Sequence, residues 1–216
     1  MKDTYHHKGL RKKLIDSLRK KGIQDERVLA AMDVLPRHFF LDKAFEEIAY
    51  QDKAFPIGND QTISQPFTLA FQTELLNVKK REKALEIGTG SGYQAAILAT
   101  LGARVFTIER QEALYNEAKF VLKELGFQGI RYYFRDGYKG LPELAPFDKI
   151  LVTAGAITVP DALLKQLKIG GVLVIPVGRK VQRMLRITKV SEEDYQKEDF
   201  GSFRFVPFLK GVENVE

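Results

Sequence analysis

Three glycines at alternate positions, directly after an apolar run, constrain this chain more than any other feature. Residues 85–98 read LEIGTGSGYQAAIL, so the glycines stand at 88, 90 and 92, between a predicted strand and an apolar helix. A strand-to-helix turn of this kind brings the backbone close to a ligand at the helix N-terminus. The segment therefore predicts an α/β fold with a nucleotide-like ligand on the turn. A tight turn needed only for packing is the alternative.

From residue 83 onward, short apolar runs alternate with helical patterns. We expect strands at 83–88, 104–110, 130–136, 148–155 and 171–178, with helices over 92–101, 111–125 and 160–167. Units of strand, helix and strand form a doubly wound, mostly parallel, Rossmann-like sheet, and near-continuous apolar strands suit a sheet covered on both faces. Residues 183–190 and 202–209, separated by the charged segment 191–199, predict an antiparallel edge to the same sheet.

The first 80 residues predict an N-terminal helical extension and a loop that belong to the same domain as the core at 81–216. Residues 8–50 show amphipathic helical patterns, and residues 52–62 are rich in the turn formers Pro, Gly, Asn and Asp. Apolar spacing after Pro66 predicts a helix that begins there. A single domain is the expectation for a chain of 216 residues.

Acidic residues end two of the predicted strands that follow the glycine turn. Glu109 stands 21 residues (109 − 88) after Gly88, near the roughly 20 at which an acid reaches ribose hydroxyls. Asp136 and Gly137 end the next strand, where Asp136 could accept from an adenine amine and Gly137 could approach the ring. Because the carboxyl ends of parallel strands share one edge, these residues and Glu86, just before the turn, predict an adenosine site.

Tyr93 helps to choose among adenosine ligands. A dinucleotide fingerprint G-x-G-x-x-G places a small residue where Tyr93 stands, so an oxidoreductase that uses NAD is the weakest alternative. The spacing G-x-G-x-G suits S-adenosylmethionine, in which an amino acid takes the place of the phosphates.

Composition limits the remaining classes of protein. The chain has no cysteine, which excludes disulfides and thiolate metal sites, and we expect no metal. No apolar run approaches the ~20 residues that cross a bilayer, and the start has no signal-peptide pattern, so a cytoplasmic protein is expected. The net charge of +6 leaves RNA binding open. One dense basic patch is predicted on the solvated face of the first helix, at Arg11, Lys12, Lys13, Arg19, Lys20 and Lys21.

Five segments together resemble the protein-L-isoaspartate O-methyltransferase family, from about residue 9 to residue 211. They are DQTISQP (60–66), LEIGTGSGYQAAILA (85–99), PFDKILVTAGA (146–156), LKIGGVLVIPVG (167–178) and RFVPFLKG (204–211). The glycine turn and GGVLVIPVG are common to many methyltransferases. QTISQP and RFVPFLKG are the segments specific to this family.

The resemblance implies that S-adenosylmethionine donates a methyl group to the α-carboxyl of L-isoaspartyl residues in damaged proteins, leaving S-adenosylhomocysteine. The family's active-site serine corresponds to Ser64, and the segment Thr62, Ile63 and Ser64 would lie over the cofactor. Val206 and Pro207 would help to form the substrate groove. Isoaspartyl proteins and peptides are then the partners, with no nucleic acid or membrane, and we expect a monomer.

A carboxylate that attacks a methyl group needs no general base, because with a pKa near 4 it is already ionised at neutral pH. Ser64 could orient that carboxylate by a hydrogen bond, whereas no activating motif beside it indicates a covalent nucleophile. Alternatively, Ser64 could be a helix N-cap. A nucleic-acid methyltransferase and a non-catalytic adenosine-binding module also stay open, although VTAGA at 152–156 lacks the motif typical of adenine amino-methylating enzymes.

Overall fold

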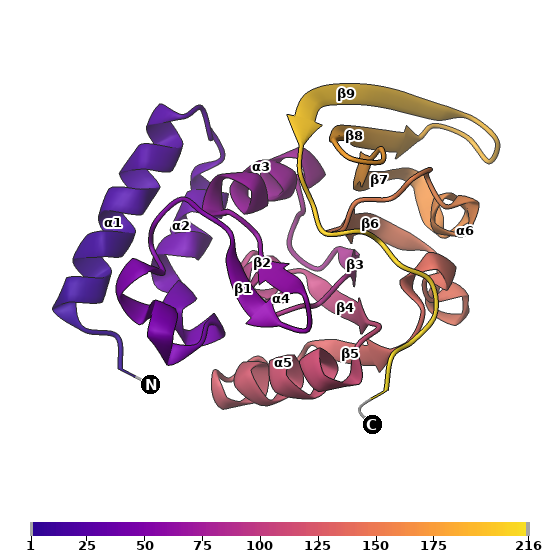
Figure 1. The fold of residues 1–216 in the computed structure, drawn as a ribbon. Coiled ribbons are helices and arrows are strands. Elements are labelled where there is room, and N and C mark those ends of the chain that lie inside the picture. Colours follow the sequence, from indigo (N-terminus) through magenta and orange to yellow (C-terminus); the bar gives the residue numbers. More distant parts are fainter. Residues whose placement is uncertain (1, 215–216) are drawn as a thin grey trace.

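A mixed sheet of seven strands forms the centre of the computed structural model, which describes residues 2–214 (Figure 1). The strand order is β5-β4-β3-β6-β7-β8-β9. The bounds are β3 Lys83–Ile87, β4 Arg104–Glu109, β5 Arg131–Phe134, β6 Phe147–Val152, β7 Leu167–Val177, β8 Gln182–Lys189 and β9 Tyr195–Phe203. Strands β3 to β7 pair in parallel, while β8 and β9 are antiparallel. The predicted fold class is therefore confirmed.

Helices cover both faces of this sheet because its strands alternate between two cores. Along β3, Ala84 packs into one core while Leu85 and Ile87 pack into the other. The first core lies under α3, α4 and α5, and the second lies under α6. Their bounds are α3 Pro66–Leu76, α4 Tyr93–Thr100, α5 Glu112–Glu124 and α6 Asp161–Lys165.

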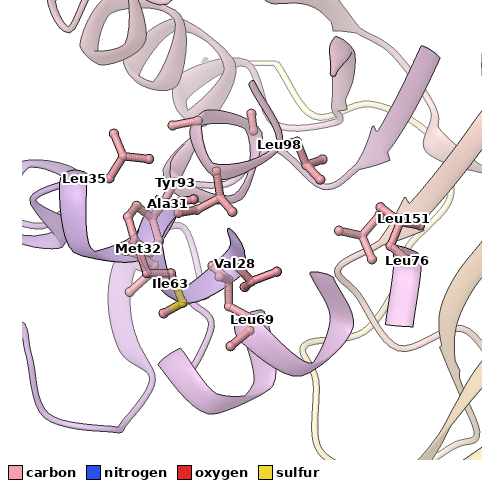
Figure 2. Packing of buried hydrophobic residues seen from close by; sticks show 14 of the residues in the cluster. Val28, Ala31, Met32, Leu35, Ile63, Leu69, Leu76, Tyr93, Leu98 and Leu151 are labelled. Carbon is pink, nitrogen blue, oxygen red and sulfur yellow. The ribbon is translucent and has the colours of Figure 1, made fainter. Parts of the chain in front are cut away.

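The N-terminal helices share the first of these cores. Helices α1 (Tyr5–Lys20) and α2 (Glu26–Val34) precede two short 3₁₀ helices, η1 (Arg37–Phe40) and η2 (Lys43–Ile48). Figure 2 shows Val28 and Met32 of α2 beside Leu69 of α3, in the same cluster as Leu98 and Leu151. None of the helices in residues 2–214 has the length and apolar character needed to cross a membrane.

The prediction of a loop over 52–62 is wrong, because this segment contains a β-hairpin. Strands β1 (Phe55–Gly58) and β2 (Gln61–Ile63) pair antiparallel. Asn59 and Asp60 connect them with φ angles of 49° and 55°. Asn and Asp tolerate this left-handed conformation, which the tightest hairpin turns require at both central residues. The turn formers therefore mark one hairpin turn.

The predicted boundary of the last strand is also wrong. Strand β9 includes most of the charged segment, and residues 204–209 lie outside the sheet. The charges suit β9 because it is an edge strand, where Glu198 and Asp199 pair with Arg186 and Arg183 across the ladder, each at distances of 2.8–3.0 Å. Residues beyond it dock on the loop after β6, since Phe208 N–H donates to the Gly155 carbonyl and Gly155 N–H to the Val206 carbonyl.

The basic patch of α1 differs from its prediction at one residue. Lys12, Lys13, Arg19, Lys20 and Lys21 are exposed as expected, but Arg11 is buried. Its guanidinium donates to both carboxylate oxygens of Asp3 and to the Tyr50 hydroxyl. Helical periodicity places Arg11 on the polar face, whereas the chain before the helix folds back and covers it.

Candidate active site

A cavity opens where the glycine turn meets the carboxyl ends of the central strands. Its walls come from parts of the chain that are distant in sequence: the β2 segment, the glycine turn, the ends of β4, β5 and β6, and the C-terminal segment. The lining includes Thr62, Ile63, Ser64, Gly88, Gly90, Tyr93, Glu109, Gly137, Thr153, Val206, Pro207 and Phe208. The structure therefore brings together nearly all the predicted site residues.

The glycine turn adopts a conformation that side chains would oppose. Gly88, Gly90 and Gly92 have φ angles of 94°, 53° and 86°, in the left-handed region. A Cβ on Gly88 would lie 2.5 Å from the Thr153 hydroxyl oxygen, which itself donates to the carbonyls of Ile87 and Gly88. The turn is thus packed tightly against the end of β6, with its backbone exposed to the cavity.

Glu109 connects the end of β4 to the glycine turn. Its side chain is 5% exposed and accepts hydrogen bonds from the amides of Gly90 (2.9 Å), Arg110 (2.8 Å) and Gln111 (3.0 Å). A carboxylate offers about four acceptor positions, so capacity is left toward the cavity that Glu109 lines. The carboxylate is held rigidly at the position from which the sequence predicts contact with ribose hydroxyls.

Glu86 lies beneath the turn, and it is not among the residues that line the cavity. It is fully buried, and its Oε2 accepts from the Thr107 hydroxyl at 2.6 Å, while the Thr107 and Thr89 hydroxyls are also 2.6 Å apart. Oε1 has no hydrogen-bond partner within residues 2–214. Burial raises the pKa of Glu86 to about 8, so the carboxyl is protonated at neutral pH. Its predicted cofactor contact could only be made through the turn.

Asp136 and Gly137 occupy different positions at the end of β5. Gly137 lines the cavity, and a Cβ there would lie 2.4 Å from Cγ2 of Ile87. Asp136 is half-buried outside the lining, where its carboxylate accepts from the Tyr138 amide at 2.9 Å and caps the short helix η3 (Gly137–Lys139). The close backbone approach at Gly137 is present, and adenine contact by Asp136 stays a prediction.

A second groove adjoins the cavity on the other side of Ser64. It is lined by Asp52, Lys53, Ala54, Thr62, Ser64, Gln65, Thr68, Thr153, Arg204, Phe205 and Val206. Ser64, Thr62, Thr153 and Val206 line both hollows. The alternative of Ser64 as a helix N-cap is wrong, because the N-cap of α3 is Gln65, and it makes no side-chain capping bond. Ser64 instead stands between the cavity and the groove.

Sequence reasoning missed several residues in and around this site, among them Thr153 and Arg37. Thr153 follows β6 and could have been found by the rule that strand ends of such sheets face the ligand. Arg37 had no such signal. It lies in the N-terminal layer, and its side chain reaches the Ser64 carbonyl at 3.0 Å.

Three potential metal ligands, Asp3, His7 and His38, gather away from this site. All three already have partners. Arg11 occupies the Asp3 carboxylate, while the His38 ring nitrogens lie 2.8 Å from the Tyr50 hydroxyl and 3.2 Å from the Lys2 carbonyl. Burial also lowers the pKa of His38. The cluster therefore binds the N-terminus to η1, and we assign it no metal.

A mostly parallel sheet with a glycine turn, a carboxylate one strand away and a cavity between them is typical of S-adenosylmethionine-dependent methyltransferases, the class to which this chain belongs. The family model described as protein-L-isoaspartate(D-aspartate) O-methyltransferase matches residues 9–213. The chain belongs to this family.

Individual relatives are similar to this chain over nearly its full length. The protein-L-isoaspartate O-methyltransferase of Christiangramia forsetii is 59% identical over 97% of this chain and 99% of its own. A solved protein-L-isoaspartate O-methyltransferase is 30% identical with a TM-score of 0.82, covering 91% of this chain and 65% of that chain. A Plasmodium falciparum protein assigned the same activity, solved with S-adenosyl-L-homocysteine, is 27% identical with a TM-score of 0.83, covering 93% of this chain and 99% of that chain.

Proposed function

We propose that the two adjoining hollows of this repair methyltransferase bind its two reactants, one in each. The cavity over the glycine turn holds S-adenosylmethionine, and the groove beyond Ser64 holds the isoaspartyl segment of a damaged protein. The observation that carries this proposal is the position of Ser64, which lines both hollows. The methyl group then passes to the α-carboxyl of the L-isoaspartyl residue at the junction.

Residues from several elements would hold the cofactor. The backbone of Gly88 and Gly90 faces the adenosine and amino-acid portions, Glu109 accepts from the ribose hydroxyls, and Gly137 with Asp136 meets the adenine. Glu86 supports the turn from below. The segment from Thr62 to Ser64 covers the cavity, because β2 leads directly into it. Support comes from the exposed turn backbone and from the free acceptor capacity of Glu109.

For this reaction the protein must chiefly align the two reactants. The cofactor supplies an electrophilic methyl group on a sulfonium centre. Within residues 2–214 no histidine lines either hollow, and none is needed, because the attacking carboxylate is ionised at neutral pH. Charge disappears as the bond forms, so a site that excludes water favours the transition state. Holding both reactants in line can contribute up to roughly 7 to 11 kcal/mol.

Ser64 would orient the acceptor. Its hydroxyl, or a backbone amide beside it, can donate to one carboxylate oxygen and leave the other directed at the methyl group. Val206 would form part of the wall of the groove, and Pro207 would support it from the side of the cavity. Val206 lines both hollows and Pro207 lines the cavity, where the bridge between Gly155 and Pro207 fixes them.

Isoaspartyl proteins and peptides would bind through their main chain, since a kinked backbone and a displaced carboxylate are what distinguish them. We further infer one domain from residues 1–80 and 81–216, which the common hydrophobic cluster supports. A monomer that acts in the cytoplasm, without nucleic acid or membrane, completes the proposal.

The test is transfer of labelled methyl from S-adenosylmethionine to two peptides that differ only in an L-isoaspartyl or L-aspartyl residue, with bulk RNA as a third acceptor. We expect label on the isoaspartyl peptide alone, released as methanol in mild base. Label on RNA alone would overturn the acceptor. Cofactor binding without any transfer would favour a non-catalytic module.

A further inference from the structure

Arg37 is a buried cation tied to the acceptor side of the site. Its side chain is 0% exposed. Nε donates to the Ala49 carbonyl (2.9 Å), Nη1 to the Ser64 carbonyl (3.0 Å) and Nη2 to the Lys53 carbonyl (3.2 Å). One guanidinium thus joins the end of η2, the segment before the β1–β2 hairpin and the active-site serine.

No carboxylate lies within ion-pair distance of this cation, since none of the ion pairs within residues 2–214 involves Arg37, and Asp52 attracts it only over a longer distance. The Tyr93 ring, whose centroid lies 5.7 Å from the guanidinium carbon, provides its other contact. Burial lowers the pKa of Arg37 to about 10, so the charge persists at neutral pH. Burying a charge without an adjacent carboxylate is costly, and the three carbonyls that accept from the guanidinium offset that cost. Packing alone does not explain an arginine here.

The orientation of the Ser64–Gln65 peptide indicates which group the Arg37 charge affects. The Ser64 carbonyl belongs to the same peptide as the Gln65 N–H, and the only cis peptide in residues 2–214 is Ala145–Pro146. In a trans peptide the N–H points opposite to the C=O. The Ser64 carbonyl points at Arg37, so the Gln65 N–H points away from Arg37. Ser64 and Gln65 both line the acceptor groove.

We propose that Arg37 is a positioning residue, which holds and polarises the Ser64–Gln65 peptide so that its N–H binds the acceptor carboxylate in the groove. This inference rests on the proposed function. A cation on the carbonyl oxygen strengthens the N–H at the other end of the same peptide as a donor. The Gln65 side chain is engaged elsewhere, with Nε2 donating to the Asp52 carbonyl at 3.1 Å, which leaves the main chain to meet the substrate.

Arg11 provides a matched control. It is also buried, at 5% exposed, but Asp3 neutralises it at 2.9 Å, and its other hydrogen bond is to Tyr50. It makes no hydrogen bond to the Ser64 segment. Loss of Arg11 should therefore disturb the N-terminal layer without changing how the groove binds a peptide.

The first experiment compares Arg37→Gln, Arg37→Lys and Arg11→Gln with the wild type. It measures kcat and KM for an isoaspartyl peptide, the Kd for S-adenosylhomocysteine and the melting temperature. We expect Arg37→Gln to raise the peptide KM about 20-fold or more, with the Kd for the cofactor product changed less than about threefold. Arg37→Lys keeps the charge and should restore part of the loss. Arg11→Gln should lower the melting temperature and leave the peptide KM near that of the wild type.

The second experiment removes the donor itself and leaves Arg37 intact. Gln65 has a φ of −51°, which proline can adopt, so Gln65→Pro deletes the N–H and keeps the φ of residue 65. Gln65→Ala loses the same side chain but keeps the N–H, and it provides the baseline. The KM for the peptide should be about tenfold higher in Gln65→Pro than in Gln65→Ala.

The outcomes distinguish the proposed function from the proposed role of Arg37. A wild-type protein that transfers no methyl group to the isoaspartyl peptide overturns the proposed function. An active wild type with equal KM values in Gln65→Pro and Gln65→Ala overturns only the role of Arg37. So does an Arg37→Gln protein that loses kcat in proportion to its folded fraction while KM is unchanged, since Arg37 would then be a structural clamp.

Discussion

The two halves of the active site are built in different ways. The cofactor half consists of consecutive elements, because the glycine turn follows β3, Glu109 ends β4 and Gly137 follows β5. The acceptor half is assembled from Arg37, the segment around Ser64, Thr153 and Val206, which are far apart in the chain. The cofactor half can be predicted from the spacing of its residues in the sequence. The acceptor half can be identified only from the folded structure, because its residues come from distant segments.

The acceptor half also has more basic groups than the cofactor half. Glu109 and Arg110 line the cofactor cavity, and the neutral Glu86 lies beneath it. Arg37 is buried behind the acceptor groove, which Lys53 and Arg204 line together with one carboxylate, Asp52. This distribution suits the two reactants, because the cofactor brings hydroxyl donors and a cation and the acceptor is an anion. Single substitutions can test whether binding in one half can be weakened without affecting binding in the other.

The largest effect is expected from Glu109→Ala. It removes the proposed acceptor for ribose and leaves three amides without their carboxylate. Each unpaired buried donor costs about 1 to 3 kcal/mol. We expect S-adenosylhomocysteine to bind about 100- to 1000-fold more weakly by calorimetry, equivalent to about 3 to 4 kcal/mol. Unchanged affinity would refute the assignment of Glu109 to the cofactor half.

Glu86→Gln should change how stability depends on pH. The folded-state pKa of about 8 lies above the ordinary 4.5, so between these values the folded state holds a proton that the unfolded state has released. Wild-type stability from this group is therefore present at low pH and is lost as pH rises through about 8. Between about pH 6 and pH 9, urea unfolding should show a loss of about 2 to 3 kcal/mol in the wild type relative to Glu86→Gln. Parallel pH profiles would contradict a protonated Glu86.

Ser64→Ala should damage the acceptor half alone. Loss of one hydrogen bond to a charged group costs about 1.5 to 2 kcal/mol, so kcat/KM for the isoaspartyl peptide should fall about 10- to 30-fold. The affinity for S-adenosylhomocysteine should stay within about twofold, because the glycine turn and Glu109 are untouched. Complete loss of transfer would contradict a role limited to one hydrogen bond.

The smallest effect is expected from Arg204→Gln. Arg204 is exposed at the groove and belongs to none of the ion pairs within residues 2–214. Exposed charges contribute about 0 to 1 kcal/mol and are screened by salt. The KM for an isoaspartyl peptide flanked by glutamates should rise about threefold at low ionic strength, and the difference should vanish at high salt. A neutral-flanked peptide is the control, and an equal rise for it would exclude an electrostatic cause.

Much of the fold could be predicted from patterns that are local. The parallel strands, the helix that begins at Pro66 and the glycine turn follow from apolar periodicity and from the φ angles that only glycine adopts easily. The predictions were wrong where contacts between distant parts of the chain determine the local structure. Charged residues 195–203 form a strand because β8 offers cross-strand partners, and Arg11 is buried because Asp3 folds back over it.

The sequence alone determined the α/β class and the cofactor, because turn chemistry and the spacing between strand ends act within a few tens of residues. The segments QTISQP and RFVPFLKG carried the resemblance to the family. Only the tertiary structure decided that Glu86 lies beneath the turn, that Ser64 stands between two hollows and that Arg37 is buried behind it. The physical reason is that the cost of burying a charge depends on groups brought from elsewhere in the chain. No local pattern records which carbonyls will surround a guanidinium.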